Sequence, residues 1–258
     1  MEILETPVAL QTWRSRLDPE KTVGVVPTMG ALHAGHRSLI RAAREACDIV
    51  VVTLFVNPTQ FNQAADLKTY PQPWKDDLAA CRAEGADAVF RPDYADLYPD
   101  DYAYRVSESR DSLDREGTHR PGHFDGVLTV VLKLFQLVRP DQTFFGEKDR
   151  QQLELVRGMI RAFFLPIQLV ACPTVRDADG LALSSRNRRL SPEARKRAAA
   201  FPRILRAADT AEEAAAALAE AGFTVDYVED RHGRRFGAVN LEGIRLIDNL
   251  LLQPAPVA

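Results

Sequence analysis

Short apolar segments alternate with helical patterns along the first two thirds of this sequence. Residues 22–27 (TVGVVP) are rich in β-branched side chains and stop at Pro27, and residues 36–46 place their apolar side chains on one side of a 3.6-residue period. Residues 48–55 are almost wholly apolar, as expected of a strand that is covered on both faces of a parallel sheet. Together the three segments predict a β-α-β unit, which is the building block of a doubly wound α/β sheet.

The same alternation continues to residue 172. We expect helices over 74–84, 127–138 and 149–163, and strands over 88–90, 142–145 and 167–170. Short connections between these elements favour a Rossmann-like, doubly wound parallel sheet. The exception is 91–126, which is rich in Asp, Tyr, Pro and Gly and is expected to be irregular, and either functional or mobile.

The pattern changes beyond Cys172. Ser191 followed by Pro192 is typical of a helix start. Thr210 and Glu213 have the spacing of a capping box in front of an Ala-rich helix. Three short strands are expected over 224–228, 238–241 and 244–247. We therefore predict two domains, 1–172 with the parallel sheet and 173–258 with a smaller α+β fold.

Composition and charge disfavour several classes of protein. Lys and Arg number 33 against 36 Asp and Glu, and this net charge of −3 offers no general attraction for nucleic acid. No apolar run approaches the roughly 18 residues of a membrane span, and the N-terminus carries acids where a secretory signal has a basic start. The wide spacing of Cys47, Cys81 and Cys172 argues against a disulfide framework or a thiolate zinc site. We expect a cytoplasmic protein that binds neither nucleic acid nor membrane.

Two histidines stand in the loop that follows the first strand of the β-α-β unit. The loop reads PTMGALHAGH, with His33 and His36 three residues apart and Gly35 between them. Ligands of open α/β sheets bind beyond the carboxyl ends of the strands, and we expect His36 to open a helix whose N-terminal N–H groups favour phosphate. The imidazoles would then donate to charge that develops on phosphorus. Two common phosphate-binding motifs are absent: G-x-G-x-x-G does not follow this strand, and G-x-x-x-x-G-K-[ST] occurs nowhere in the sequence. Their absence disfavours a dinucleotide dehydrogenase and a Walker-type ATPase.

Two further strings could bind an anion. The string 146–149 (GEKD) follows a predicted strand, so Lys148 could reach a phosphate at the same edge of the sheet, or could be a solvated lysine beside a helix cap. Ser184, Ser185 and Arg186 offer two hydroxyls and a guanidinium for an anion clamp, although such strings are also common in surface loops.

Two other strings could contact a small substrate. Gln60, at the end of the second strand, offers a donor and an acceptor to a molecule with hydroxyl and carboxylate groups, or could bond to its own turn. The string 120–124 (RPGHF) lies in the long irregular stretch, where it could cover the crevice or form a packed turn.

Taken together, these strings resemble the pantothenate synthetase family, the ligases that join pantoate to β-alanine with ATP. The matching strings, in the family's order, are PTMGALHAGH (27–36), FVNPTQF (55–61), RPGHF (120–124), FFGEKD (144–149), LSSRN (183–187) and RLIDN (245–249). H-x-G-H alone marks only a wider nucleotidyl-transferase superfamily, whereas the NPTQF, GEKD and SSR strings make the resemblance specific.

The resemblance implies a Rossmann-like domain for ATP and pantoate, a small C-terminal lid, a homodimer, and Mg²⁺ with ATP as the nucleotide. It implies an acid/base role for His36 and pantoate binding by Gln60 and Gln152. From the sequence we assign no metal-ligating side chain. The nucleotide-binding residues that it implies are Met29, Gly30, Ala31, Leu32, His33, Ala34, Gly35, His36, Gly146, Glu147, Lys148, Asp149, Val175, Leu183, Ser184, Ser185 and Arg186. The family usually has methionine at Leu183, arginine at Gln72 and a longer C-terminal domain.

The implied reaction has two steps. The carboxylate of pantoate attacks the α-phosphorus of ATP to give pantoyl adenylate and pyrophosphate, and the amine of β-alanine then releases AMP. The residues expected to stabilise charge on the phosphoryl oxygens are His33, His36, Lys148, Ser184, Ser185 and Arg186, with Mg²⁺ bridging other oxygens. No enzyme nucleophile is required, in line with the absence of a G-x-S-x-G string.

Three other functions stay open at this point. A nucleotidylyltransferase of the same superfamily would retain AMP on its product. A metal-binding module could use His33, His36, His119 and His123, although proline and glycine between the second pair break any helix that would align them. A class I aminoacyl-tRNA synthetase shares the histidine motif, but this chain is short and slightly acidic and has no spare domain for tRNA.

Overall fold

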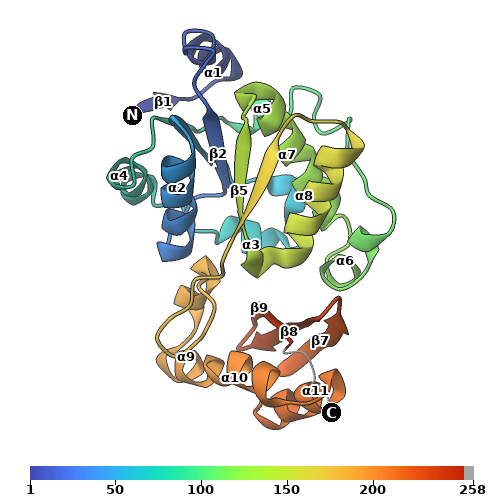
Figure 1. Cartoon of the computed structure of the whole chain (residues 1–258). Helices are drawn as coiled ribbons and strands as arrows, with labels where there is room; N and C mark the ends of the chain where they lie inside the picture. Colours follow the sequence, from blue (N-terminus) through green and yellow to red (C-terminus); the bar gives the residue numbers. More distant parts are fainter. Residues whose placement is uncertain (253–258) are drawn as a thin grey trace, which may run out of the picture. The chain divides into compact units, whose positions relative to one another are not determined.

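The computed structural model describes residues 1–252 and divides into two compact units (Figure 1). The first unit comprises Met1–Glu147 and Gln151–Cys172, and the second comprises Lys148–Arg150 and the described residues 173–252. Each unit has its own sheet and its own hydrophobic core.

A six-stranded parallel sheet forms the centre of the first unit. Its strands are β1 (Glu2–Leu4), β2 (Val23–Thr28), β3 (Ile49–Leu54), β4 (Ala88–Phe90), β5 (Gln142–Gly146) and β6 (Gln168–Cys172). They lie in the order β1-β4-β3-β2-β5-β6, and all neighbours are parallel. The chain runs to one side of β2 through β3 and continues on the other side at β5. The carboxyl ends of β2 and β5 therefore flank the topological switch point, where open α/β sheets bind ligands. The predicted doubly wound parallel sheet is confirmed.

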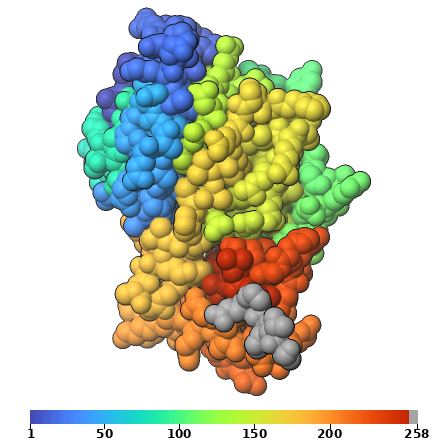
Figure 2. Space-filling view, viewed as in Figure 1, coloured from blue at the N-terminus to red at the C-terminus, as the bar shows by residue number. Residues whose placement is uncertain are grey.

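Helices cover both faces of this sheet. The longer ones are α1 (Pro7–Arg14), α2 (Ala34–Ala46), α4 (Trp74–Ala83), α7 (His123–Val138) and α8 (Arg150–Ala162). The shorter elements are η1 (Pro58–Gln60), α3 (Ala64–Lys68), α5 (Tyr94–Leu97), η2 (Asp111–Leu113), α6 (Glu116–His119) and η3 (Glu147–Asp149). Figure 2 shows α2 (light blue) and α8 (yellow) at the protein surface. No helix within residues 1–252 is both long and apolar enough to cross a membrane.

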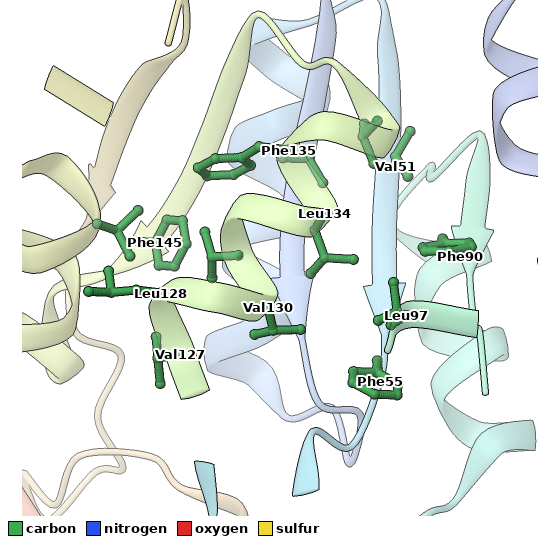
Figure 3. Packing of buried hydrophobic residues seen from close by; sticks show 14 of the residues in the cluster. Val51, Phe55, Phe90, Leu97, Val127, Leu128, Val130, Leu134, Phe135 and Phe145 are labelled. Carbon is green, nitrogen blue, oxygen red and sulfur yellow. The ribbon is translucent and has the colours of Figure 1, made fainter. Parts of the chain in front are cut away.

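Successive side chains of the central strands pack into two different hydrophobic clusters. Val25 and Val51 pack with α1, α7 and α8 on one face of the sheet, and Figure 3 shows α7 lying against the strands in this cluster. Val26 and Val52 point to the other face and pack with α2 and α4. Because both faces are buried, these strands have the near-continuous apolar sequences from which they were predicted.

The second unit is a three-stranded antiparallel sheet with short helices. Its elements are η4 (Ser185–Arg189), α9 (Pro192–Ala198), α10 (Ala200–Ala207), α11 (Ala211–Glu220), β7 (Thr224–Arg231), β8 (Arg234–Leu241) and β9 (Ile244–Leu251). Phe201, Leu205 and Leu218 of the helices are fully buried in its core. The predicted α+β fold of this region is confirmed.

Two predicted helix starts of the second unit are confirmed. Ser191 caps α9, because its Oγ accepts the N–H of Ala194 at 3.1 Å. Thr210 and Glu213 form the predicted reciprocal capping box at α11. Both signals are local, since each side chain bonds to a backbone group three residues away.

Other elements differ from the sequence-based expectation. No element was predicted over β1 and α1, although Thr6 caps α1 and Pro7 occupies its first turn. The long helix α7 begins at His123 and not at 127. Strand β8 begins at Arg234 and not at 238. The prediction missed its first residues because they include charged side chains that are buried.

Candidate active site

The two predicted histidines form the N-terminal cap of α2. His33 is the N-cap residue, and its Nδ1 accepts the N–H of Gly35 at 3.1 Å. His36 lies at the third helical position, and its Nδ1 accepts the N–H of His33 at 3.4 Å. The ring centroids are 4.1 Å apart. The expectation that His36 opens the helix is wrong by two positions, because His33 takes the cap and α2 begins at Ala34.

These hydrogen bonds determine which ring nitrogen carries the proton. Because each Nδ1 accepts a backbone N–H, the proton of a neutral imidazole at His33 or His36 is on Nε2. Each ring therefore offers an Nε2–H donor at the start of α2. The dipole of the helix favours an anion at this place.

A buried carboxylate holds the loop that leads to these histidines. Asp77, on α4, is 1% exposed and accepts the N–H of Ala31 at 2.9 Å and that of Leu32 at 2.7 Å. Gly30 has φ +82° and Ala31 has φ +51°. The left-handed conformation costs a non-glycine residue about 1 to 2 kcal/mol, so Asp77 stabilises an unfavourable backbone.

Sequence reasoning did not single out Asp77. Its one signal is its place in α4, four residues before the buried Cys81, which makes it an acid on the inward side of a helix. Acids at such positions need buried partners, and here the partners are backbone N–H groups of the histidine loop.

Gln60 lies beside the histidine loop. Its Nε2 donates to the sulfur of Met29 at 3.2 Å, and its Oε1 accepts from Asn57 Nδ2 at 3.0 Å. The structure thus brings together the loop after β2 and the turn after β3, two segments that are adjacent because their strands pair in register.

Asn57 orients the Gln60 amide. It is 1% exposed, and its Oδ1 accepts from the hydroxyl of Tyr98 at 3.0 Å. Burial raises the pKa of Tyr98 to about 12, so its hydroxyl stays a donor at neutral pH. The role of Tyr98 was not predicted, because it comes from the stretch 91–126, where no pattern relates one residue to another.

The string 120–124 packs against the backbone of Gln60. His123 Nδ1 bonds to the Gln60 carbonyl at 2.8 Å, and Arg120 donates to the same oxygen at 3.3 Å. His123 is 6% exposed. Of the two expectations for this string, the structure favours the packed turn, and the string runs into the first residues of α7.

The GEKD string lies at the end of β5. Lys148 is in η3, and its ammonium is 3.6 Å from the carboxylate of Asp149. The side chain of Lys148 is 19% exposed and that of Asp149 is 48% exposed. The carbonyl of Lys148 accepts the Nδ2 of Asn249 at 3.0 Å. Lys148 therefore belongs to the second unit, although Gly146 and Glu147 belong to the first.

The other predicted nucleotide residues of the second unit lie in one loop. Ser184 caps η4 by accepting the N–H of Arg186 at 3.3 Å, and Ser185 is the first residue of that turn. Leu183 and Val175 are joined by a backbone hydrogen bond of 3.0 Å. In the first unit, Gln152 lies half-buried in α8. The convergence of both sets of residues on one nucleotide stays a prediction.

Metal binding by histidine clusters finds no support in these positions. His33 and His36 cap a helix, and His123 bonds to a carbonyl. Over residues 1–252, no group of three or more His, Cys, Asp or Glu side chains is arranged to hold a metal ion.

Known proteins were compared with the whole chain. A family model described as pantoate-beta-alanine ligase matches residues 2–251. A pantothenate synthetase from Bdellovibrio bacteriovorus is 54% identical over 249 residues, which covers 96% of this chain and 98% of the relative. This chain and that relative are therefore of similar length.

Solved structures agree with this assignment. A pantoate-beta-alanine ligase from Francisella tularensis, complexed with beta-gamma ATP and beta-alanine, matches with a TM-score of 0.94 and 38% identity over 100% of both chains. A pantothenate synthetase from Thermus thermophilus matches with a TM-score of 0.89 and 41% identity over 98% of this chain and 100% of the other. The chain therefore belongs to the pantoate–β-alanine ligase family, as its loop strings predicted.

Proposed function

We propose that this ligase forms pantothenate through a pantoyl adenylate, at the carboxyl edge of its parallel sheet. The observation that carries the proposal is the pair of imidazoles at the start of α2, in the loop after β2, where the sulfur of Met29 accepts a hydrogen bond from Gln60. A phosphate site and a site for a small polar acid would then be neighbours, as a reaction between the two substrates requires.

The first step activates the carboxylate of pantoate. A carboxylate oxygen attacks the α-phosphorus of ATP, the bond from that phosphorus to the bridging oxygen breaks, and pyrophosphate leaves. In the second step the amine of β-alanine attacks the acyl carbon, the bond to AMP breaks, and the amine loses a proton. The complex of the Francisella tularensis ligase with an ATP-type nucleotide and β-alanine supports this choice of substrates.

The histidines would act on the phosphate. The Nε2–H groups of His33 and His36 would donate to the phosphoryl oxygens as negative charge builds up on them, and the N-terminal N–H groups of α2 would add to the effect. His36 is the proposed acid/base group. Glycine at position 35 leaves room for the His33 ring, because a Cβ there would lie 2.9 Å from Cε1 of His33.

The second unit would supply cations and hydroxyls to the same nucleotide. Lys148 would provide a point charge, and Arg186 a planar guanidinium that suits phosphate oxygens. Ser184 and Ser185 add hydroxyl donors. Val175 and Leu183 would complete this part of the site, and the second unit would act as a lid that keeps water from the adenylate.

Gln60 and Gln152 would hold pantoate. The amide of Gln60 is held by Met29 on one side and Asn57 on the other, so its donor and acceptor have set directions. A set direction suits a substrate with hydroxyl and carboxylate groups, because each substrate group then meets a partner that is already oriented.

Mg²⁺ is the proposed companion of ATP. The GEKD turn offers a fitting donor in the half-exposed carboxylate of Asp149, since Mg²⁺ is commonly held by one or two carboxylates together with phosphate oxygens and waters. When bound, the ion would neutralise charge on the phosphate oxygens. The homodimer and the cytoplasmic location stay predictions.

One assay separates this proposal from a nucleotidylyltransferase. The chain is incubated with ATP, Mg²⁺, pantoate and β-alanine, and each component is omitted in turn. We expect free AMP and pantothenate only in the complete mixture. A final product of the complete mixture that retains AMP, or AMP release that does not depend on pantoate, would contradict the proposal.

A further inference from the structure

The RLIDN string of the sequence ends in two buried polar residues of β9. Asp248 and Asn249 are each 3% exposed. The amide of Asn249 donates from Nδ2 to the carbonyl oxygen of Lys148 at 3.0 Å. A strand of the second unit thus bonds to the backbone of the proposed phosphate lysine, 101 residues away in the chain.

The charge of a neighbouring arginine determines the orientation of this amide. Asn249 Oδ1 accepts from the Nε of Arg234 at 3.0 Å, and Arg234 is 9% exposed. A rotated amide would place its NH₂ group against the guanidinium and its oxygen against the carbonyl of Lys148. Both contacts would be repulsive, so the donor of Asn249 is directed at Lys148.

The strand that carries Asn249 is itself held by an ion pair. The backbone N–H of Asn249 donates to Asp248 Oδ1 at 2.7 Å. Asp248 receives two bonds from Arg176, at 2.6 Å and 2.8 Å, and Arg176 also donates to the carbonyl of Gly180 at 3.0 Å. The hydrogen bond to Asp248 raises the pKa of Arg176, so the guanidinium of Arg176 stays charged.

We infer that Asn249 is a positioning residue, which holds the backbone of Lys148 so that its ammonium group faces the phosphates of ATP. The inference rests on the proposed function of Lys148. The bond from Asn249 is a physical reason why Lys148–Arg150 belong with the second unit. Without this bond the ammonium of Lys148 would lose its orientation towards the phosphates, because the carboxylate of Asp149, 3.6 Å away, competes for it.

The primary variant is Asn249→Asp. It keeps the size of the side chain and an oxygen beside Arg234, and it removes the donor to Lys148. We expect the KM for ATP to rise about tenfold, as for the loss of a supporting bond behind a ligand-binding group, with a smaller change in kcat. In a second readout, an amine-reactive reagent labels Lys148 and mass spectrometry measures the protection that ATP gives. That protection should weaken in the variant.

A double variant tests whether Asn249 acts through Lys148. In a Lys148→Ala background, Asn249→Asp should cause no further rise in the KM for ATP, since its target is gone. An additional rise equal to that in the wild-type background would overturn the inference. If Lys148→Ala alone leaves the KM for ATP unchanged, the proposed role of Lys148 fails and the inference fails with it. If only the Asn249 variants are silent, the inference fails and the role of Lys148 stands.

A matched control comes from the neighbouring strand. Asn240, on β8, donates to Asp226 at 2.9 Å and not to the lysine turn. Asn240→Ala and Asn249→Ala each remove an asparagine from the same sheet, and Asn249→Ala also replaces Asn249→Asp if the latter fails to fold. Only the Asn249 variant should change the ATP protection of Lys148. Equal changes in both variants would assign Asn249 a merely structural role.

Discussion

The histidine loop and the lysine turn, both proposed to bind phosphate, are supported in different ways. The buried carboxylate of Asp77 holds the loop by accepting two backbone N–H groups of the loop. The reciprocal cap of His33 and His36 is a second support. The lysine turn is held in the second unit through the neutral amide of Asn249. The difference teaches that the two proposed phosphate contacts have separate supports, so damage to each should be measurable separately.

The largest effect is expected from His36→Ala. The variant removes an Nε2–H donor from the proposed phosphate site, and kcat should fall about 10²- to 10³-fold, as for the loss of one transition-state donor. Release of AMP measures it. The control is His232→Ala, since His232 is exposed at the β7–β8 turn. Wild-type turnover in His36→Ala would contradict the proposed role of the histidine loop in the reaction.

Asp77→Ala should reduce both stability and rate. Two backbone N–H groups of the loop lose a buried charged acceptor, and the free energy of unfolding should fall by about 3 kcal/mol. We expect kcat to fall more than the KM for ATP rises, in contrast to Asn249→Asp. Chemical denaturation and steady-state kinetics measure the two quantities. Asp76→Ala is the matched control, because Asp76 is the exposed neighbour in the same helix; equal effects in both variants would contradict the proposed support.

Tyr98→Phe sharpens the comparison inside the first unit. The variant removes only the hydroxyl that donates to Asn57, so the amide of Gln60 loses part of its support. We expect the KM for pantoate to rise about threefold to tenfold, which corresponds to about one hydrogen bond, while the KM for ATP stays unchanged. A change in the KM for ATP alone would show that Gln60 serves the nucleotide instead.

The smallest effect is expected from acid titration of Asp100. The N–H of Tyr104 and the ammonium of Lys133 bond to its carboxylate and lower its pKa from 3.8 to about 2. Because the folded pKa is below the unfolded one, Asp100 stabilises the fold above about pH 4, and this contribution is lost as the pH falls towards 2. Unfolding experiments across this window should show a weaker pH dependence in Asp100→Asn. An identical pH dependence of the free energy of unfolding in variant and wild type would refute the stabilising role of Asp100.

Local sequence patterns predicted much of the fold, because most elements carry their own signal. The apolar run 48–55 predicted β3, and the helical period over 36–46 predicted most of α2. Thr210 predicted the start of α11, because a cap bonds to a nearby N–H group.

Buried charges limited the prediction of the second unit. Arg235 is fully buried, where it bonds to Asp230 and to the carbonyls of Leu205 and Ala208. An arginine in a short sequence window indicates an exposed position, so the predicted strand began at 238 and missed the first residues of β8.

In the candidate site, too, some residues carry a local sequence signal and others do not. The strings around His36, Gln60 and Lys148 were found in the sequence, because each is a continuous motif that resembles one family. Asp77 and Asn249 received no role, because neither stands beside the backbone it supports.

The alternation of the main strands and helices, the caps at Ser191 and Thr210 and the family were determined by the sequence itself, since each depends on neighbours in the chain or on continuous strings. Only the tertiary structure decided that Asp77 meets the N–H of Ala31, 46 residues away, and that Asn249 meets Lys148, 101 residues away. The physical reason is that a buried polar group must find a hydrogen-bond partner, and packing determines which distant backbone group lies within reach.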